Sequence, residues 1–244
     1  LDFVFRISTG YSKQPRNLYR YLIDNDSLIK SPQSGATIRG CTVFDVSGDK
    51  SPEFLLEVSA TGNTNEDFPF SDQYSWIMVL DKNLKFLFPP VKIGNYPSNV
   101  RIVPVNHENQ KRFAVLYDYI GSENYKSMFY ILDTNGNIVI EKPAGNIGNT
   151  FCNLIQNEEK DYRTFYLLKN SETEVEEYSS SLNVIKTFIL PEIQESAIIT
   201  RFDADLDGNQ EYLFKGRDKK TLIISRSNLR NSISYKLEKV FEGD

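Results

Sequence analysis

A short loop near the C-terminal end of the chain carries the residues best suited to chemistry. Oxygen-bearing side chains stand there at every second position, as Asp203, Asp205, Asp207, Asn209 and Glu211. A hard cation such as Ca²⁺ takes roughly 6–8 oxygen ligands and tolerates irregular geometry, so this donor set suits it. The four carboxylates would give side-chain oxygens, and Asn209 would give a backbone carbonyl. Such an ion would be structural, because ligands from a single turn leave no substrate cleft.

The same loop can also be interpreted without a metal. Asp side chains often accept hydrogen bonds from the backbone N–H groups of their own turn. Four carboxylates that lie close together repel one another, so an empty loop would raise the pKa of some of them. The sequence leaves both the bound cation and the self-capped turn open.

The loop belongs to an internal repeat. An earlier segment, Asp45–Glu53, has the same frame with fewer ligands, and we expect a plain turn there. A second repeating feature is a hairpin turn between two apolar runs. These turns begin at Asp24, Asp81, Asp133, Ser179 and Ser225, with spacings of 57, 52, 46 and 46 residues. A further strand pair lies between successive hairpins, so each unit contributes four short strands, which is typical of a propeller blade.

We therefore predict an all-β fold, a β-propeller of about five four-stranded blades in a single domain. That domain covers residues 1–244, with units of roughly 1–35, 36–92, 93–143, 144–191 and 192–244, and the first unit lacks its innermost strand. The apolar runs are nearly continuous, as expected when both faces of a sheet are covered. No stretch has an apolar stripe of helical period, so we expect little helix.

Composition excludes some classes of function. The chain is 40% hydrophobic and 25% charged, as globular proteins are, and its 14 Tyr and 16 Phe favour β structure. A net charge of −5 and the lack of a Lys/Arg stripe give no reason to expect nucleic-acid binding. No apolar run approaches the length of a membrane span, so we expect no membrane insertion within this segment. The first residue is Leu1 rather than Met, so we expect a trimmed segment of a longer precursor.

Several other conspicuous residues have structural interpretations. Cys41 and Cys152 occupy matching places in non-adjacent units, so we expect two unpaired, buried thiols. His107, the only histidine, has no second ligand nearby in sequence for zinc, and we expect it in a solvated turn. Trp76 and Phe70 could form an aromatic binding platform, but we favour packing between blades. No nucleophile motif such as Gly-x-Ser-x-Gly is present.

The Asp203–Glu211 loop, followed by Tyr212–Phe214, resembles FG-GAP and VCBS-like propeller repeats. In those families an Asp-x-Asp-x-Asp-Gly-x-x-Asp/Glu loop often binds Ca²⁺ between two strands of one blade, so the resemblance implies a structural calcium ion here. The loops at the equivalent positions, Pro104–Phe113 and Gln156–Phe165, have lost the acidic pattern. The segment Ser75–Val91 looks like part of the extracytoplasmic propeller regions of Bacteroidetes-type sensor histidine kinases.

These features lead us to expect a binding module and no enzyme. The resemblance implies the extracytoplasmic ligand- or protein-sensing domain of a membrane sensor, in the periplasm or at the cell surface. We expect rim loops, such as Thr61–Gln73 and Ile120–Lys126, or one end of the channel to contact a protein or glycan. Two alternatives are an adhesion or scaffold propeller and a glycan-active enzyme with an acidic pair across a central pocket.

Overall fold

The computed structural model describes residues 2–7, 16–63, 68–121, 127–144, 152–156, 161–169, 174–189, 193–202, 211–216, 220–224 and 237–242. These residues form an all-β fold of one three-stranded and four four-stranded antiparallel sheets. The chain divides into two compact units. Unit 1 is Leu1–Asn149 with Glu158–Arg163, and unit 2 is Thr150–Asn157 with Thr164–Asp244. No helix in the described ranges is long and apolar enough to cross a membrane.

Every sheet takes its strands in chain order. The first two sheets of unit 1 are β1 (Asp2–Ile7), β2 (Asn17–Leu22) and β3 (Ser27–Lys30), then β4 (Thr37–Phe44), β5 (Glu53–Ser59), β6 (Tyr74–Leu80) and β7 (Val91–Asn95). The third is β8 (Ser98–His107), β9 (Gln110–Tyr119), β10 (Met128–Leu132) and β11 (Ile138–Pro143). Unit 2 has β12 (Cys152–Gln156), β13 (Thr164–Lys169), β14 (Glu174–Ser179) and β15 (Val184–Ile189). Its second sheet is β16 (Ile193–Phe202), β17 (Glu211–Gly216), β18 (Lys220–Ile224) and β19 (Leu237–Glu242).

Three hairpin turns predicted from the sequence share one geometry, and they begin at Asp81, Asp133 and Ser179. In each, a side-chain oxygen of the first residue accepts a hydrogen bond from the backbone N–H four residues later, at 2.8, 2.8 and 3.2 Å. The fourth residue of each turn has a left-handed backbone, with φ of 57°, 85° and 59°. The first turn differs, because a 3-10 turn at Ile23–Asn25 moves the left-handed residue to Asp26. The repeat is thus visible in individual hydrogen bonds; the turn at Ser225 lies outside the described residues.

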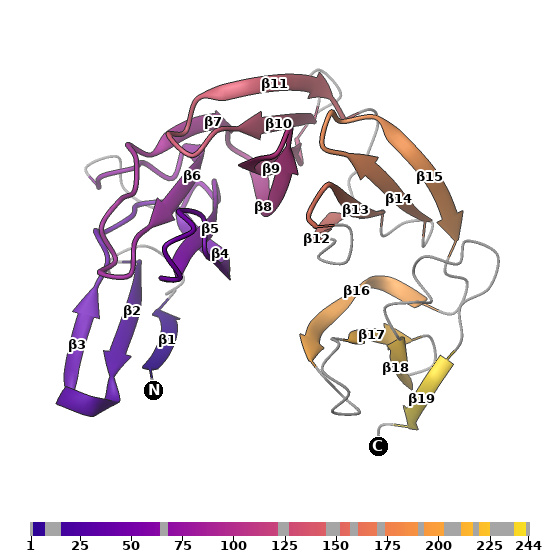
Figure 1. Cartoon of the computed structure of the whole chain (residues 1–244), viewed down its shortest axis with the longest axis horizontal. Coiled ribbons are helices and arrows are strands. Elements are labelled where there is room, and N and C mark those ends of the chain that lie inside the picture. The colour runs from indigo at the N-terminus through magenta and orange to yellow at the C-terminus, as the bar shows by residue number, and fades with distance from the viewer. Residues whose placement is uncertain are drawn as a thin grey trace. The chain divides into compact units, whose positions relative to one another are not determined.

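Strand β5 is buried on both faces, as its nearly continuous apolar run predicts. Leu56 packs with Leu18 of β2 in one core cluster. Its neighbour Leu55 packs with Ile102 of β8 and Phe113 of β9 in a second cluster. The three sheets of unit 1 therefore lie side by side, with the β4–β7 sheet in the middle (Figure 1).

The sequence predicts that the first strands of three sheets begin at Cys41, Val100 and Ile198. In the structure each begins earlier, with β4 at Thr37, β8 at Ser98 and β16 at Ile193. The Cys41 thiol is exposed, so the expectation that it would be buried is wrong. The physical reason is the position of β4, which has no further strand beyond it in its sheet and leaves Cys41 and Val43 exposed on one face.

Candidate functional site

Most of the predicted calcium loop lies outside the described residues, namely Asp203, Asp205, Asp207 and Asn209. Glu211 is the first residue of β17 and pairs with Phe202 at the end of β16, so the loop does connect two antiparallel strands. Among the residues that the structure describes, no three His, Cys, Asp or Glu side chains could hold a metal ion together. The calcium site stays a prediction.

The matching loop at Asp45 is a self-capped turn, as the sequence indicates. Asp45 Oδ1 accepts a hydrogen bond from the backbone N–H of Gly48 at 2.5 Å. The buried Glu53 carboxylate accepts one from the N–H of Val46 at 2.6 Å. Lys111 of β9 donates to the backbone oxygen of Asp45 and lies 3.8 Å from its carboxylate. The chain's own donors therefore use the oxygens that a cation would need.

The structure also shows the surroundings of Trp76 and His107. The indole N–H of Trp76 donates to the Ser71 carbonyl at 3.0 Å, and its ring meets Phe70 edge-on at a centroid distance of 5.5 Å. Both rings also pack against the core cluster that joins the first two sheets of unit 1, so packing between sheets is confirmed for them. The solvated turn expected for His107 is wrong, because β8 extends to this residue and its side chain is only 11% exposed.

An unpredicted feature occurs on β4, the first strand of the middle sheet of unit 1. Arg39 is the extra residue of a β-bulge, since Ile38 pairs with Val58 and Gly40 pairs with Glu57. Bulges re-aim side chains and are frequent beside active sites. The Arg39 side chain is exposed, and it makes no hydrogen bond or ion pair within the described part of the chain.

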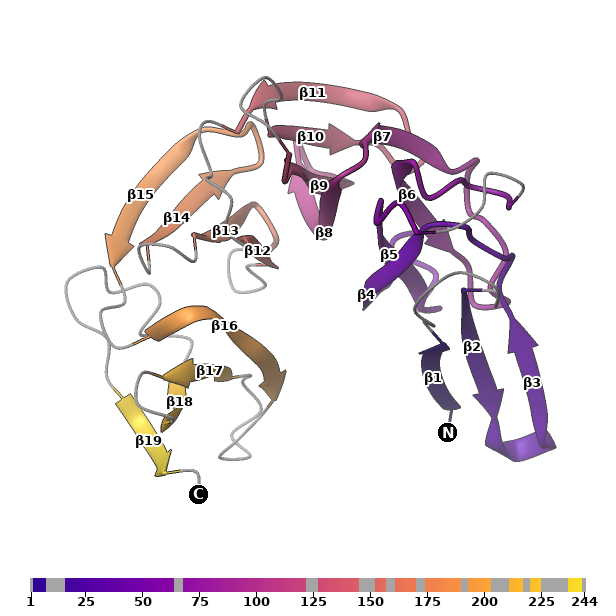
Figure 2. The ribbon, with the colours of Figure 1, turned by 180° about the vertical axis from the view of Figure 1, so that it is seen from behind.

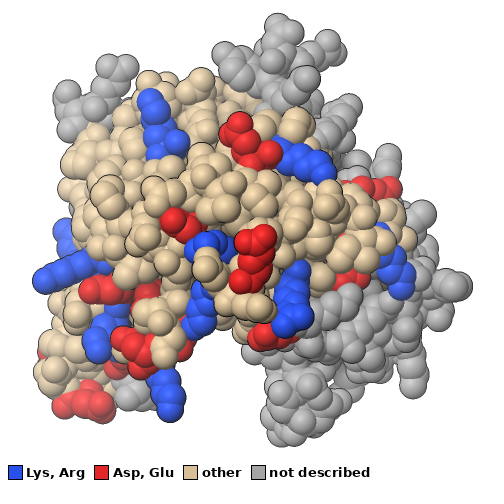
Figure 3. Space-filling model, turned by 45° about the horizontal axis from the view of Figure 1, so that its top comes forward, with Lys and Arg blue, Asp and Glu red and all other residues tan. Residues whose placement is uncertain are grey.

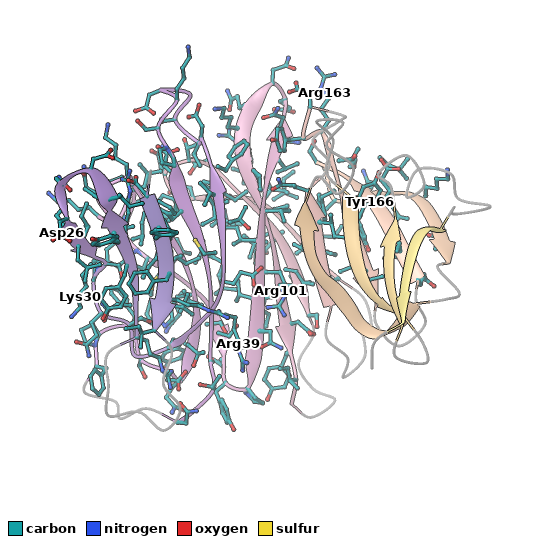
Figure 4. All side chains as sticks on the ribbon, turned by 90° about the horizontal axis from the view of Figure 1, so that it is seen from below. Asp26, Lys30, Arg39, Arg101, Arg163 and Tyr166 are labelled. Carbon is teal, nitrogen blue, oxygen red and sulfur yellow. The ribbon has the colours of Figure 1, made fainter. Side chains whose placement is uncertain are left out.

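Two further arginines flank Arg39, and we call Arg6, Arg39 and Arg101 the arginine cluster. Arg6 of β1 donates from Nη1 to the carbonyl of Ile38 at 2.6 Å. Arg101 of β8 lies 3.3 Å from the Glu57 carboxylate, measured from Nη1 to Oε2. Strands β4 and β8 are in contact. Figure 2 shows these strands and β1 from behind, and Figure 4 labels Arg39 and Arg101 on β4 and β8. The three arginines thus lie on β1, β4 and β8, each of which is the first strand of its sheet in chain order.

Gly40 is the local signal in the sequence that could have revealed this site. An isolated glycine inside a strand pattern indicates a bulge or a close approach of another group. A Cβ atom at Gly40 would lie 2.8 Å from Cδ of Glu57. The glycine therefore leaves room for the Glu57 carboxylate to pass β4 and reach Arg101.

Burial and like charge set the electrostatics of the cluster. Partial desolvation of the exposed Arg39 side chain lowers its pKa, and the charges of Arg101 and Arg6 lower it further. An arginine remains protonated at neutral pH even so. Burial raises the pKa of Glu57, and the charge of Arg101 opposes that shift. Elsewhere, on the face shown in Figure 3, acidic and basic side chains are interspersed over the described surface.

Two more titratable groups lie beside the cluster. Burial raises the pKa of Asp118, on β9, to about 6, while a hydrogen bond from Ser127 at 3.0 Å acts against that shift. Although Cys41 lies on an exposed face, the atoms packed around its sulfur partly desolvate it; this desolvation, followed by the charge of Glu57, raises the pKa of the thiol to about 12. A protonated thiol is a poor nucleophile. The arrangement therefore supplies positive charge and hydrogen-bond donors, and its one thiol is not activated.

The fold and site define an all-β protein of sequential antiparallel sheets with a basic cluster on first strands. No protein-family model matches the chain, and a search of curated proteins gives no match. Among solved structures the chain is similar to Raptor from Chaetomium thermophilum, with 11% identity and a TM-score of 0.56 over 100% of this chain and 20% of that one. A protein of unknown function from Bacteroides caccae gives 10% identity and a TM-score of 0.48, over 98% of this chain and 73% of that one. The likeness to Raptor shows a shared fold alone.

Proposed function

We propose that the repeated sheets are the blades of a β-propeller with about five blades, and that the chain is a non-catalytic binding module. Support for the propeller comes from the chain-order arrangement of strands in every sheet. Within unit 1, successive sheets also pack through two core clusters, which is how stacked blades bury both faces. In such a fold the innermost strands face the channel. β4 and β8 would be innermost strands, and β1 would be the strand nearest the channel in a unit that lacks one, so the arginine cluster would lie where a ligand can enter.

One observation carries the binding proposal, namely that the guanidinium of Arg39 is exposed and has no partner among the described residues. Two other arginines of unit 1 form ion pairs, Arg16 with Asp72 and Arg20 with Asp2. A bulge that brings an unpaired arginine near two others gives the fold no evident benefit, because like charges repel. We infer that the repulsion between these arginines is tolerated because they bind a ligand.

Binding is favoured over catalysis by the partners of the nearby carboxyl groups. Glu57 is held by Arg101, and Asp118 accepts a hydrogen bond from Ser127. Neither is presented as a free acid or base, and the Cys41 thiol is protonated at neutral pH. The site is therefore better suited to hold a ligand than to cleave one.

Within this class we propose the extracytoplasmic sensing domain of a membrane sensor. The resemblance of Ser75–Val91 to sensor propellers supports this, and a protein or glycan is the ligand we expect. The Thr61–Gln73 loop is a second contact surface whose start is firmly held. Asp72 accepts hydrogen bonds there from the backbone N–H groups of Thr61, at 2.8 Å, and Asn63, at 3.0 Å.

A thermal-unfolding screen tests the binding function. Trp76 is the only tryptophan and reports on unit 1 by its fluorescence. We expect at least one class among neutral sugars, acidic sugars, amino acids and short peptides to raise the unfolding midpoint, because a ligand that binds only the native state stabilises it. Arg39→Ala should cancel that rise. A shift that survives both Arg39→Ala and Arg6→Ala, or no shift with any class, would contradict the proposal.

We further propose that Ca²⁺ is held by Asp203, Asp205, Asp207, Asn209 and Glu211, whose hard oxygen donors fit that ion. The ion would neutralise the carboxylates and hold the loop closed. In scanning calorimetry, CaCl₂ at about 100 times the dissociation constant should add about 2.7 kcal/mol of stability relative to EDTA. Asp205→Ala should abolish the gain, whereas Asp49→Ala, in the self-capped loop, should leave it intact. Equal unfolding midpoints in EDTA and in CaCl₂ would show that the loop binds no calcium ion.

A further inference from the structure

The donors of the arginine cluster are only partly used. A guanidinium carries five N–H donors and no acceptor. Arg39 uses none of its donors on the described residues, and Arg6 uses only Nη1. Arg101 donates only from Nη1, to the Glu57 carboxylate and to the Val100 carbonyl at 3.1 Å. Each of the three residues therefore keeps N–H donors that have no partner among the described residues.

The local charge is also unbalanced. Among the described residues, one carboxylate contacts the three guanidinium groups, that of Glu57 on Arg101. Asp118 also interacts with Arg101, but only at longer range. The buried ion pair of Arg16 and Asp72 also acts on Arg39, but its two charges oppose each other. An anion between the three arginines would relieve their mutual repulsion.

We propose that the arginine cluster binds the oxyanion group of a small acidic ligand, either a carboxylate or a phosphate. This inference rests on the proposed binding function and names the chemistry of its ligand. Guanidinium groups recognise carboxylates and phosphates through paired, charge-assisted hydrogen bonds, which an ammonium cannot reproduce. Arg39 is the primary contact because it is exposed and makes no bond to any residue that the structure describes, while Arg6 is anchored to Ile38 and Arg101 to Glu57.

Unfolding of the full chain, followed by Trp76 fluorescence, tests this with three probes at constant ionic strength. Inorganic phosphate and galacturonate present the two oxyanions, and galactose is the neutral match. We expect an anion to raise the midpoint and galactose to leave it unchanged. Arg39→Ala and Arg39→Lys should weaken anion binding by about tenfold or more. Both variants should fold, because Arg39 has no bonds within the described structure to lose.

Two variants serve as controls. Lys30→Ala removes one exposed positive charge from β3, away from the cluster in Figure 4, and should retain full anion binding. Glu57→Gln removes the competing carboxylate and should tighten anion binding, a gain that a misfolded protein cannot imitate. A response to phosphate alone or to galacturonate alone assigns the oxyanion.

The outcomes separate the inference from the function on which it rests. If galactose shifts the midpoint in an Arg39-dependent way and neither anion does, the binding function holds and the anion proposal is overturned. If an anion shifts the midpoint equally in the wild type and in Arg39→Ala, it binds elsewhere and the proposal is also overturned. If no probe of any class binds, both the binding function and the anion proposal are contradicted.

Discussion

Replacing Asp72 by alanine is expected to lower the free energy of unfolding of unit 1 by about 3–5 kcal/mol, because it leaves a buried charge without its partner. The side chains of Arg16 and Asp72 are 2% and 0% exposed, and Nη1 lies 3.2 Å from Oδ2. Asp72 also accepts hydrogen bonds from the backbone N–H groups of Thr61 and Asn63, which would lose their acceptor. Urea unfolding followed by Trp76 fluorescence measures the loss close to the altered residue.

Asp2→Ala is the matched control, since it removes the carboxylate of another Asp–Arg pair in the same unit. The pair of Asp2 and Arg20 lies at the surface. Water screens such pairs, so the expected loss is below about 1 kcal/mol. Equal losses in the two variants would show that the Asp72 pair is not buried as described.

Replacing Phe113 by alanine is expected to cost about 3–5 kcal/mol, because it opens a cavity in a closed core. Phe113 is 0% exposed and lies in the cluster between the β4–β7 and β8–β11 sheets. Its ring centroid lies 6.1 Å from that of Phe88, across the interface between the sheets. The same urea experiment measures the effect, since both sheets belong to unit 1.

Phe3→Ala controls for the loss of an aromatic side chain. Phe3 of β1 is 58% exposed, so its truncation should change stability by no more than about 0.5 kcal/mol. If Phe113→Ala costs as little as Phe3→Ala, then the two sheets do not form a closed interface. The stacking of successive sheets, and with it the main support for a propeller, would then be lost.

The parts of the fold that depend on local sequence could be predicted. Asp81 and Asp133 each cap a hairpin with their own side chain, and that chemistry is contained within five residues of sequence. The strand pairs followed from the apolar runs on either side of such turns. The two-sided burial of β5 followed from an uninterrupted apolar run, which needs no knowledge of its neighbours.

The candidate site could not be predicted in the same way, because its members come from different sheets. Arg6, Arg39 and Arg101 are separated by 33 and 62 residues, so no local pattern joins them. Only Gly40 marks the place locally, and the predicted strand began one residue after it. A strand that starts at Cys41 leaves Arg39 in a loop, whereas the observed strand places it on a bulge.

The acidic loops illustrate a different limit of sequence reasoning. At Asp45 the carboxylates are used by backbone N–H groups of the turn, including that of Gly48. The same residue types in the Asp203–Glu211 loop could serve either N–H groups or a cation, because both need oxygen acceptors at close spacing. Spacing alone does not choose between these two partners.

The most direct test of the central claim, that the arginine cluster is a ligand site, is a crystal structure with selenate. Selenate is an oxyanion whose selenium can be located by its anomalous scattering. We predict a selenium peak with its oxygens within hydrogen-bonding distance of the Arg39 guanidinium and of Arg6 or Arg101. Selenate bound at other surface arginines, with Arg39 solvent-facing and free of anion in the same crystal, would contradict the claim.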